Sequence, residues 1–162
     1  MAEHRLPVGR LLDSLQREWP AAGKVVQPAT LLLYRARDRL FDDLTDTLAP
    51  FGLLPADLDV LVALRTQPPP RQLTPTVLYR SLLLSSGGLT KILHRLQNCG
   101  LIERPANPDD RRSRLVRLTE AGAQLLDQLL DYLVAHEERF LAPLNTAQRH
   151  RLAALLHQLI TE

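Results

Sequence analysis

A run of arginines beside an acidic turn is the part of this sequence with the clearest chemistry. The turn Asn107-Pro108-Asp109-Asp110 precedes Arg111, Arg112, Arg114 and Arg117. Each guanidinium presents N–H donors in a planar fork, a geometry that matches the oxygens of a phosphate group. Because a row of such groups attracts a polyanion, nucleic acid is the first partner to consider.

Apolar segments on both sides of the arginines predict a β-hairpin. Residues 101–104 can form one strand and residues 115–118 the other, while Pro108 and the two aspartates after it provide the turn. The arginines would then project on a two-stranded ribbon. Arg117 is the exception, because strand alternation can direct it toward the body of the protein and an acidic partner.

Two short helices are predicted before this hairpin. Thr74 is a typical N-cap ahead of Pro75, and the first helix is expected to end near Leu82. After a tight turn, a second helix covers residues 86–99 and closes at Gly100. Two short helices followed by a hairpin form a winged helix-turn-helix, whose second helix enters the major groove of DNA.

The outer face of that second helix is polar. Lys91, His94 and Asn98 share it and are long or polar enough to reach base edges. The glycine-rich start of the helix leaves backbone N–H groups open to phosphate, because a helix N-terminus carries partial positive charge. The candidate DNA contacts are Ser85, Ser86, Gly87, Thr90, Lys91, His94, Arg95, Asn98, Arg111, Arg112 and Arg114.

The inner face of the same helix is apolar and is predicted to pack, with Leu89, Ile92, Leu93, Leu96 and Cys99 on it. Cys99 is the only cysteine, so the chain cannot form an internal disulfide. We interpret it as a small packed hydrophobe. The alternative is a redox-sensitive thiol, which would need an accessible, electropositive setting.

Further helices are predicted on both sides of this region. Apolar residues recur at helical spacing over residues 8–19, 28–50 and 55–67, with Leu58, Leu61 and Val62 inward in the last, and again over 119–144 and 145–160. The terminal helices carry more apolar surface than one chain can cover, which favours a homodimer.

Taken together, the predicted elements indicate a mainly α fold with a small β-hairpin wing. The expected division is a winged helix-turn-helix lobe at residues 55–118 and a helical dimerisation region formed by residues 1–54 and 119–162.

Composition narrows the functional classes. The 162-residue chain has a formal net charge of +2, but Arg80 to Arg117 contains eight basic and three acidic residues. Such a concentrated basic segment indicates a local anionic surface as partner.

No apolar run is long enough to span a membrane and no secretory signal is apparent, so we expect a cytoplasmic protein. The sequence lacks a nucleophile elbow, a phosphate-binding loop and a zinc-binding histidine pair. We expect neither an enzyme nor a cofactor or metal site.

Several motifs together resemble the multiple-antibiotic-resistance regulator (MarR) family over about residues 28–161. They are Leu73-Thr74-Pro75, Leu84-Ser85-Ser86-Gly87-Gly88-Leu89-Thr90-Lys91, Arg95-Leu96, Gly100-Leu101-Ile102-Glu103-Arg104, Asn107-Pro108-Asp109-Asp110-Arg111-Arg112 and Thr119-Glu120-Ala121-Gly122. The resemblance implies a homodimer joined by its terminal helices, binding to a pseudo-palindromic double-stranded DNA operator, and usually repression relieved by a small molecule.

The N-terminal extension with Trp19 and the segments Leu58-Asp59-Val60-Leu61 and His136-Glu137-Glu138-Arg139 suggest a narrower resemblance. They are similar to the urate-responsive branch of that family. In that branch a tryptophan, an aspartate and two arginines are associated with the response, and Trp19, Asp59 and Arg104 match three of these places. The fourth falls near Ile92, whose apolar side chain can neither pair with Asp59 nor neutralise urate. This departure argues against urate itself, and we expect an aromatic carboxylate or a urate-like anion.

Each candidate ligand residue also has a structural alternative. For Trp19 we favour a packing role, in which the indole anchors the first helix to the core, over contact with a ligand. Asp59 would serve equally well as an exposed polar residue or as the partner of a nearby arginine. Arg104 could bind an anionic effector, bind a phosphate or pair with Asp110.

Two other functions compete with a ligand-responsive DNA-binding repressor. One is a winged-helix protein-interaction module that does not use DNA. The other is a regulator switched by oxidation of Cys99. Salt-dependent duplex binding distinguishes the first, because phosphate contacts release counterions and protein docking does not.

Overall fold

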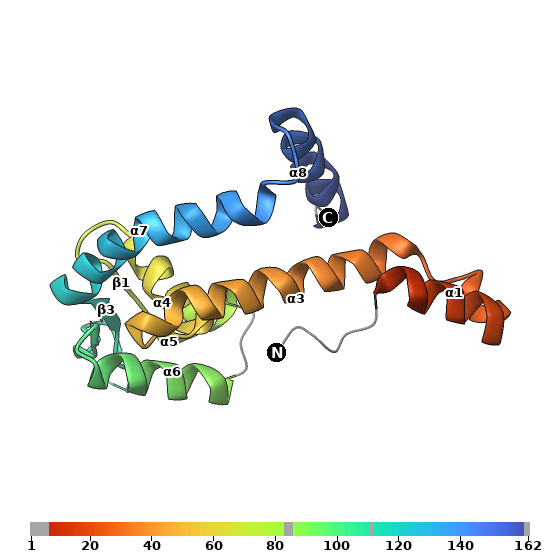
Figure 1. Ribbon diagram of the computed structural model, residues 1–162. Coiled ribbons are helices and arrows are strands. Elements are labelled where there is room, and N and C mark those ends of the chain that lie inside the picture. The colour runs from red at the N-terminus through yellow and green to blue at the C-terminus, as the bar shows by residue number, and fades with distance from the viewer. Residues whose placement is uncertain (1–6, 83–85, 111, 161–162) are drawn as a thin grey trace. The chain divides into compact units, whose positions relative to one another are not determined.

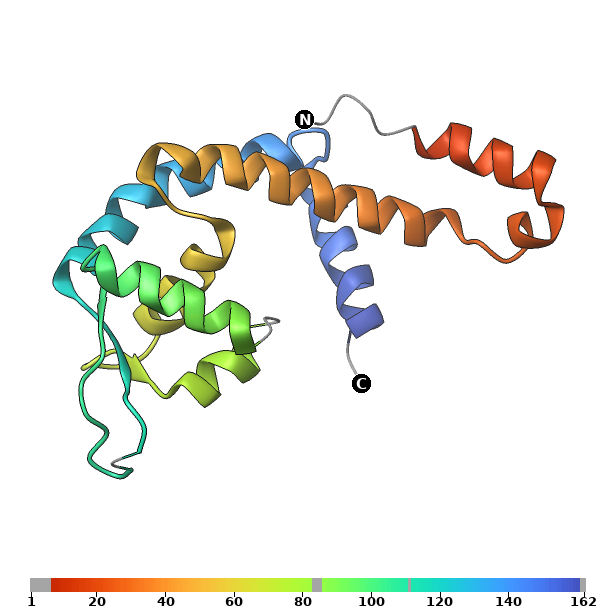
Figure 2. The same cartoon turned by 90° about the horizontal axis from the view of Figure 1, so that it is seen from below.

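The computed structural model describes residues 7–82, 86–110 and 112–160. The chain forms two compact units, residues 1–46 and 47–162 (Figures 1 and 2). Its elements are α1 (Val8–Glu18), α2 (Pro20–Gly23), α3 (Pro28–Leu48), the 3₁₀ turn η2 (Ala49–Phe51), α4 (Pro55–Arg65), β1 (Gln72–Leu73), α5 (Pro75–Ser81), α6 (Ser86–Asn98), β2 (Ile102–Glu103), β3 (Val116–Leu118), α7 (Glu120–Leu141) and α8 (Thr146–Ile160).

The first unit contains α1, α2 and most of α3. Helices α1 and α3 match the predicted helical segments, whereas the short helix α2 was not predicted. Pro20 and Pro28 stand at the first positions of α2 and α3, where their missing N–H has no helical partner to lose. Trp19 lies between α1 and α2 and is 65% exposed. The predicted anchoring of the first helix by Trp19 is therefore not found, since the indole is not part of a core.

The second unit is built around a small antiparallel sheet with the strand order β1-β3-β2. Leu73 pairs with Val116, and Ile102 pairs with Leu118. The hairpin of β2 and β3 confirms the predicted wing, and a further bridge between Ala106 and Arg114 extends the ribbon toward its tip. Figure 2 shows the hairpin projecting beyond the helices of this unit. The sequence analysis did not predict β1, because it has only two residues.

Helices α4 to α7 share one apolar core in this unit. Leu61, Leu78, Leu96 and Leu129 have no exposed surface or almost none, and they come from α4, α5, α6 and α7 respectively. Replacing buried side chains of this size by alanine commonly costs about 2–5 kcal/mol, so this cluster stabilises the mutual position of the four helices.

Two predictions about inward-facing residues are wrong. Val62 of α4 is 41% exposed, because Leu58 and Leu61 already define the centre of the buried face and Val62 lies beyond its edge. Cys99 is exposed, because α6 ends at Asn98 and the chain then turns away. Gly100 adopts a φ of 71°, the left-handed conformation typical of a helix C-terminus, so the chain changes direction directly after Cys99.

The base of the wing is fixed to the start of α7. The Thr119 hydroxyl donates to the Gly100 carbonyl at 2.7 Å and accepts from the Gly122 N–H at 3.1 Å. A Cβ at position 122 would lie 2.3 Å from the Leu101 carbonyl oxygen, so only glycine permits this approach. The start of α7 therefore holds the wing at its root.

Helices α7 and α8 carry much exposed apolar surface. Leu130, Val134, Leu155, Leu159 and Ile160 are each more than half exposed. Between the helices, Asn145 and Gln148 exchange two side-chain to backbone hydrogen bonds of 2.9 Å, a capping box that begins α8.

Within the residues described, no single helix is long and apolar enough to cross a membrane. The consecutive segments 28–51 and 55–65 reach the length and composition of a membrane span only when they are taken together.

Candidate nucleic-acid interface

Helix α6 presents the polar face that its sequence predicts. Lys91, His94 and Asn98 are exposed, whereas Leu93 and Leu96 on the opposite side are buried. Asn98 Nδ2 lies 3.2 Å from His94 Nδ1, so the two candidate base-reading side chains hold each other one helical turn apart. Thr90 is also exposed. Polar side chains of this kind can reach base edges when a helix enters a major groove.

The start of α6 is only partly described. Ser86 and Gly87 lie in its first turn, and a helix N-terminus of this kind attracts an anion. Ser85 lies outside the described residues. The phosphate contact predicted for these three residues stays a prediction.

Arg95 differs from the other candidate contacts because its guanidinium is engaged inside the protein. Its Nε donates to Asp57 Oδ2 at 3.1 Å, and its Nη2 donates to Asp57 Oδ1. The Asp57 side chain has no exposed surface, while 38% of the Arg95 side chain is exposed. Arg95 therefore links α6 to α4, which its position on the helical wheel did not reveal.

The tip of the wing is shaped by its own polar residues. The Asn107 side chain is largely buried, accepts from the Asp109 N–H at 3.1 Å and donates to the Ser113 hydroxyl at 2.9 Å. Asp110 Oδ1 accepts from the Arg112 N–H at 2.9 Å. The carboxylate of Asp110 thus orders the backbone instead of pairing with Arg104, which was one predicted alternative. Arg111 lies outside the described residues.

The wing arginines divide into paired and unpaired cations. Arg117 donates to Glu103 across the β2–β3 ladder, and this contact lowers the pKa of the Glu103 carboxyl and raises the pKa of the Arg117 guanidinium. Arg112 and Arg114 are exposed, and no carboxylate within the described part of the chain forms an ion pair with either. The acidic partner expected for Arg117 is found, although both side chains of the pair are well exposed. Arg112 and Arg114 are the wing arginines that we assign to phosphate.

Arg104 lies at the root of the wing and is bound to the opposite strand. Its Nε donates to the Leu115 carbonyl at 3.0 Å, and Arg114 Nη1 donates in turn to the Arg104 carbonyl at 3.1 Å. Partial burial, together with the charge of Arg114, lowers the pKa of the Arg104 guanidinium. Two neighbouring cations with carbonyl partners would be stabilised by an anion.

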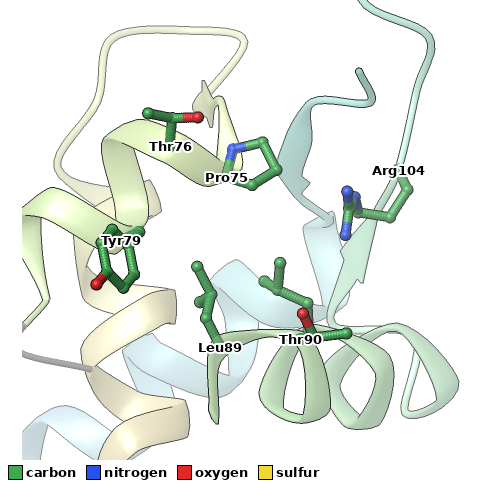
Figure 3. A pocket seen from close by; sticks show the side chains of 7 residues that line it. Pro75, Thr76, Tyr79, Leu89, Thr90 and Arg104 are labelled. Atoms are coloured by element: carbon green, nitrogen blue, oxygen red, sulfur yellow. The ribbon is translucent and has the colours of Figure 1, made fainter. Parts of the chain in front are cut away.

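Two hollows meet at Arg104. An apolar pocket of about 410 Å³ lies between α5, α6 and the wing, with Tyr79, Leu89 and Thr90 on its walls and Arg104 at its edge (Figure 3). A larger polar groove of about 630 Å³ continues toward the wing tip. Both are also lined by Pro75 and Thr76. The groove is further lined by Thr74, Asn107, Asp110, Arg112, Ser113 and Arg114.

The three predicted ligand residues are not gathered in either hollow. Trp19 belongs to the first unit, whereas Asp59 and Arg104 belong to the second. Asp59 is an exposed residue of α4 and lines neither hollow, although partial burial raises the pKa of its carboxyl. Ile92 is buried in the core and lines neither hollow.

Sequence reasoning missed two contributions to this interface. Thr74 and Thr76 line the polar groove, but their proximity to the wing depends on the short strand β1. Asp57 holds Arg95, and its only sequence signal was an acidic residue in the first turn of a helix that begins at Pro55. No group of three or more potential metal ligands occurs in the portion of the chain that the structure describes.

Comparison with known proteins identifies the family. A sequence model of the MarR family matches residues 51–113, which contain α4, the helix pair and most of the wing. The multiple antibiotic resistance protein MarR of Salmonella typhimurium is 34% identical over 101 residues, covering 62% of this chain and 68% of that protein. The chain belongs to the MarR family. Another relative is the transcriptional regulator PecS of Dickeya dadantii, 29% identical over 127 residues, with 78% of this chain and 72% of PecS covered.

A solved structure shows how a related MarR protein uses this fold. A variant of Escherichia coli MarR crystallised with operator DNA has a TM-score of 0.74 and 25% identity to this chain. The match covers 91% of this chain and 98% of that one. The predicted winged helix-turn-helix of this MarR-family chain is therefore confirmed, and its relatives are transcriptional regulators.

Proposed function

We propose that this MarR-family chain acts as a homodimer that binds a pseudo-palindromic DNA operator and represses transcription. Each α6 would enter a major groove, with Lys91, His94 and Asn98 toward the base edges. The wings would contact flanking phosphates or the minor groove. The observation that carries this proposal is the exposed polar face of α6 together with Arg112 and Arg114, which form no ion pair within residues 7–82, 86–110 and 112–160.

Charge distribution within the interface supports DNA over a protein partner. Glu103 is paired with Arg117, whereas the carboxylates of Asp109 and Asp110 are exposed at the turn. Residues 109–114 contain three arginines and two aspartates, so the end of the ribbon keeps a net positive charge. A surface of this kind binds duplexes through phosphate neutralisation, and base contacts add sequence preference.

The exposed apolar residues of α7 and α8 support the homodimer. Leu155, Leu159 and Ile160 form part of a surface that is costly to leave in water. Two-fold pairing would bury it and place two copies of α6 on one side of a duplex, about one helical turn apart. The division into a lobe at residues 55–118 and a dimerisation region formed by residues 1–54 and 119–162 is part of this proposal.

A selection from random duplex DNA, followed by titration at several salt concentrations, tests the function. We expect one enriched, two-fold symmetric site and an affinity that falls steeply as salt increases. A weak salt dependence without enrichment would refute DNA recognition and favour a protein-interaction module. Light scattering of the free and DNA-bound protein would establish the dimer.

We further propose that a small aromatic anion relieves repression by occupying the apolar pocket. Its walls come from α5 and α6, and the guanidinium of Arg104 at its edge would pair with a carboxylate (Figure 3). Because α6 forms one wall, a ligand would bias the position of the recognition helix and lower DNA affinity if it prefers a non-binding arrangement.

Titration calorimetry with benzoate and urate, repeated on Arg104→Gln and Arg112→Ala, tests this effector site. We expect binding of an aromatic carboxylate to be lost with the first substitution and kept with the second, since Arg112 does not line the apolar pocket. Equal binding by Arg104→Gln and the unchanged protein would refute the site. Membership of the urate-responsive branch stays a proposal supported by Trp19, Asp59 and Arg104, with Ile92 as the departure.

The exposure of Cys99 keeps a thiol switch as a second candidate for regulation. An accessible thiol at the end of the recognition helix could alter α6 when oxidised. The test is the DNA-binding response to peroxide in Cys99→Ser. A response retained after the substitution would exclude this mechanism.

A further inference from the structure

One buried carboxylate connects the recognition helix to the centre of the DNA-binding lobe. Asp57 lies in the first turn of α4 and has no exposed side-chain surface. Its Oδ2 accepts from the Leu54 N–H at 2.8 Å and from Arg95 Nε at 3.1 Å, while Oδ1 accepts from Arg95 Nη2. The carboxylate is therefore satisfied by one backbone donor and by both arms of a guanidinium fork.

This geometry fixes how α6 is turned about its own axis. A two-point contact between a planar guanidinium and a planar carboxylate restricts both rotation and sliding. Arg95 is four residues after Lys91 and three before Asn98, so it lies beside the row that faces outward. Leu89, Leu93 and Leu96 pack on the other side, and the fork contact adds a directional polar contact to this apolar packing.

The pair also determines where positive charge is available. Arg95 is partly exposed next to the DNA-reading face, yet its charge is matched by Asp57. Arg112 and Arg114 have no such partner in the described chain. The interface therefore contains paired and unpaired arginines. Only the unpaired arginines should contribute to the salt dependence of DNA binding.

We propose that Asp57 is a specificity-determining positioning residue, which sets the reading face of α6 through Arg95 and keeps Arg95 from contacting phosphate. The inference rests on the proposed DNA-binding function. It assigns Arg95 an internal role, in contrast to the direct DNA contact expected from the sequence. The consequence is that removing the Asp57 charge should increase non-specific binding while reducing discrimination.

The decisive substitution is Asp57→Asn, which keeps an oxygen for the Leu54 N–H but removes the charge that holds Arg95. A freed guanidinium in each subunit should make the salt slope of duplex binding steeper by about 1.8 per dimer, at about 0.9 per phosphate contact. Loss of alignment should lower the affinity ratio between the selected duplex and a scrambled duplex by about tenfold, within the range of one base contact. Simple loss of structure would weaken binding without steepening the slope.

Two further variants separate charge release from damage to the fold. Arg95→Gln should leave the salt slope unchanged, because the charge that it removes is already matched. The double variant Asp57→Asn with Arg95→Gln, in which two neutral amides can hydrogen-bond, should return the slope to the unchanged protein's value. Asp127→Asn is the matched control, since it breaks the exposed Arg65–Asp127 pair between α4 and α7 and leaves α6 untouched.

Circular dichroism and thermal melting establish which variants are folded, and fluorescence anisotropy gives the slopes. The proposal is overturned if folded Asp57→Asn keeps both the slope and the selectivity of the unchanged protein, or if Arg95→Gln flattens the slope. If Asp57→Asn does not fold, Arg95→Gln and the double variant decide. Failure of the unchanged protein to bind any duplex would instead refute the proposed function, and this inference with it.

Discussion

Removal of Arg112 is the sharpest test of the wing as a phosphate clamp. The side chain is exposed on the ribbon and has no carboxylate partner within the described chain, so a homodimer presents two such charges. At about 0.9 per phosphate contact, Arg112→Ala should flatten the salt slope by about 1.8. The loss of DNA affinity caused by Arg112→Ala should therefore be largest at low salt concentration.

The change in salt slope predicts how the ratio of the two proteins' DNA affinities varies with salt concentration. When salt rises fourfold, from about 50 to 200 mM, the affinity advantage of the unchanged protein over Arg112→Ala should shrink about twelvefold. Fluorescence anisotropy with the selected duplex and with a scrambled duplex measures this. Both duplexes should show the same change, because a phosphate contact carries little sequence information.

Arg117→Ala is the matched control for this experiment. It removes the same type of side chain from the same hairpin, but the Arg117 charge is already paired with Glu103. We expect its salt slope to stay close to that of the unchanged protein. Equal flattening by both substitutions would show that net charge matters and that the pairing seen in the wing does not, and the reasoning would fail.

Three other outcomes follow from the structure. Asn98→Ala should change sequence preference by about 1–3 kcal/mol at one base position with little effect on the salt slope, measured by repeating the duplex selection; an unaltered site would remove Asn98 from the reading face. Gly122→Ala should destabilise the fold by about 1–3 kcal/mol in urea unfolding, because its Cβ would meet the Leu101 carbonyl, whereas Gly9→Ala meets nothing within 4 Å and should not. Partial burial raises the pKa of Asp59, so folding opposes its charged form; Asp59→Asn should stabilise the protein at neutral pH, and the gain should vanish as pH falls through the folded and then the unfolded pKa. A gain that persists in acid would contradict this cause.

The pairing of cations explains why counting basic residues is a poor measure of a DNA-binding surface. Arg95, Arg112 and Arg117 are close in sequence and of the same type, yet two of them are matched by a carboxylate. A salt bridge at the surface contributes little to stability, but it removes a charge from the field that a duplex meets. The available charge is thus set by where the acidic residues lie.

Local sequence signals were sufficient for most of the elements. Thr74 before Pro75 determined the start of α5, and the Thr74 hydroxyl accepts from the Val77 N–H at 3.2 Å as an N-cap should. Gly100 determined the end of α6 through its left-handed backbone. These signals act within a few residues, so they do not depend on the rest of the fold.

Tertiary structure alone determined which side chains of the interface contact each other. The fork between Asp57 and Arg95 joins residues 38 positions apart, and the wheel of α6 could only assign Arg95 to its border. The meeting of Thr76 with Arg104 depends on packing α5 beside the wing. A side chain at the edge of a helix can turn toward solvent or toward the core, and which it does depends on a partner that periodicity within one element does not specify.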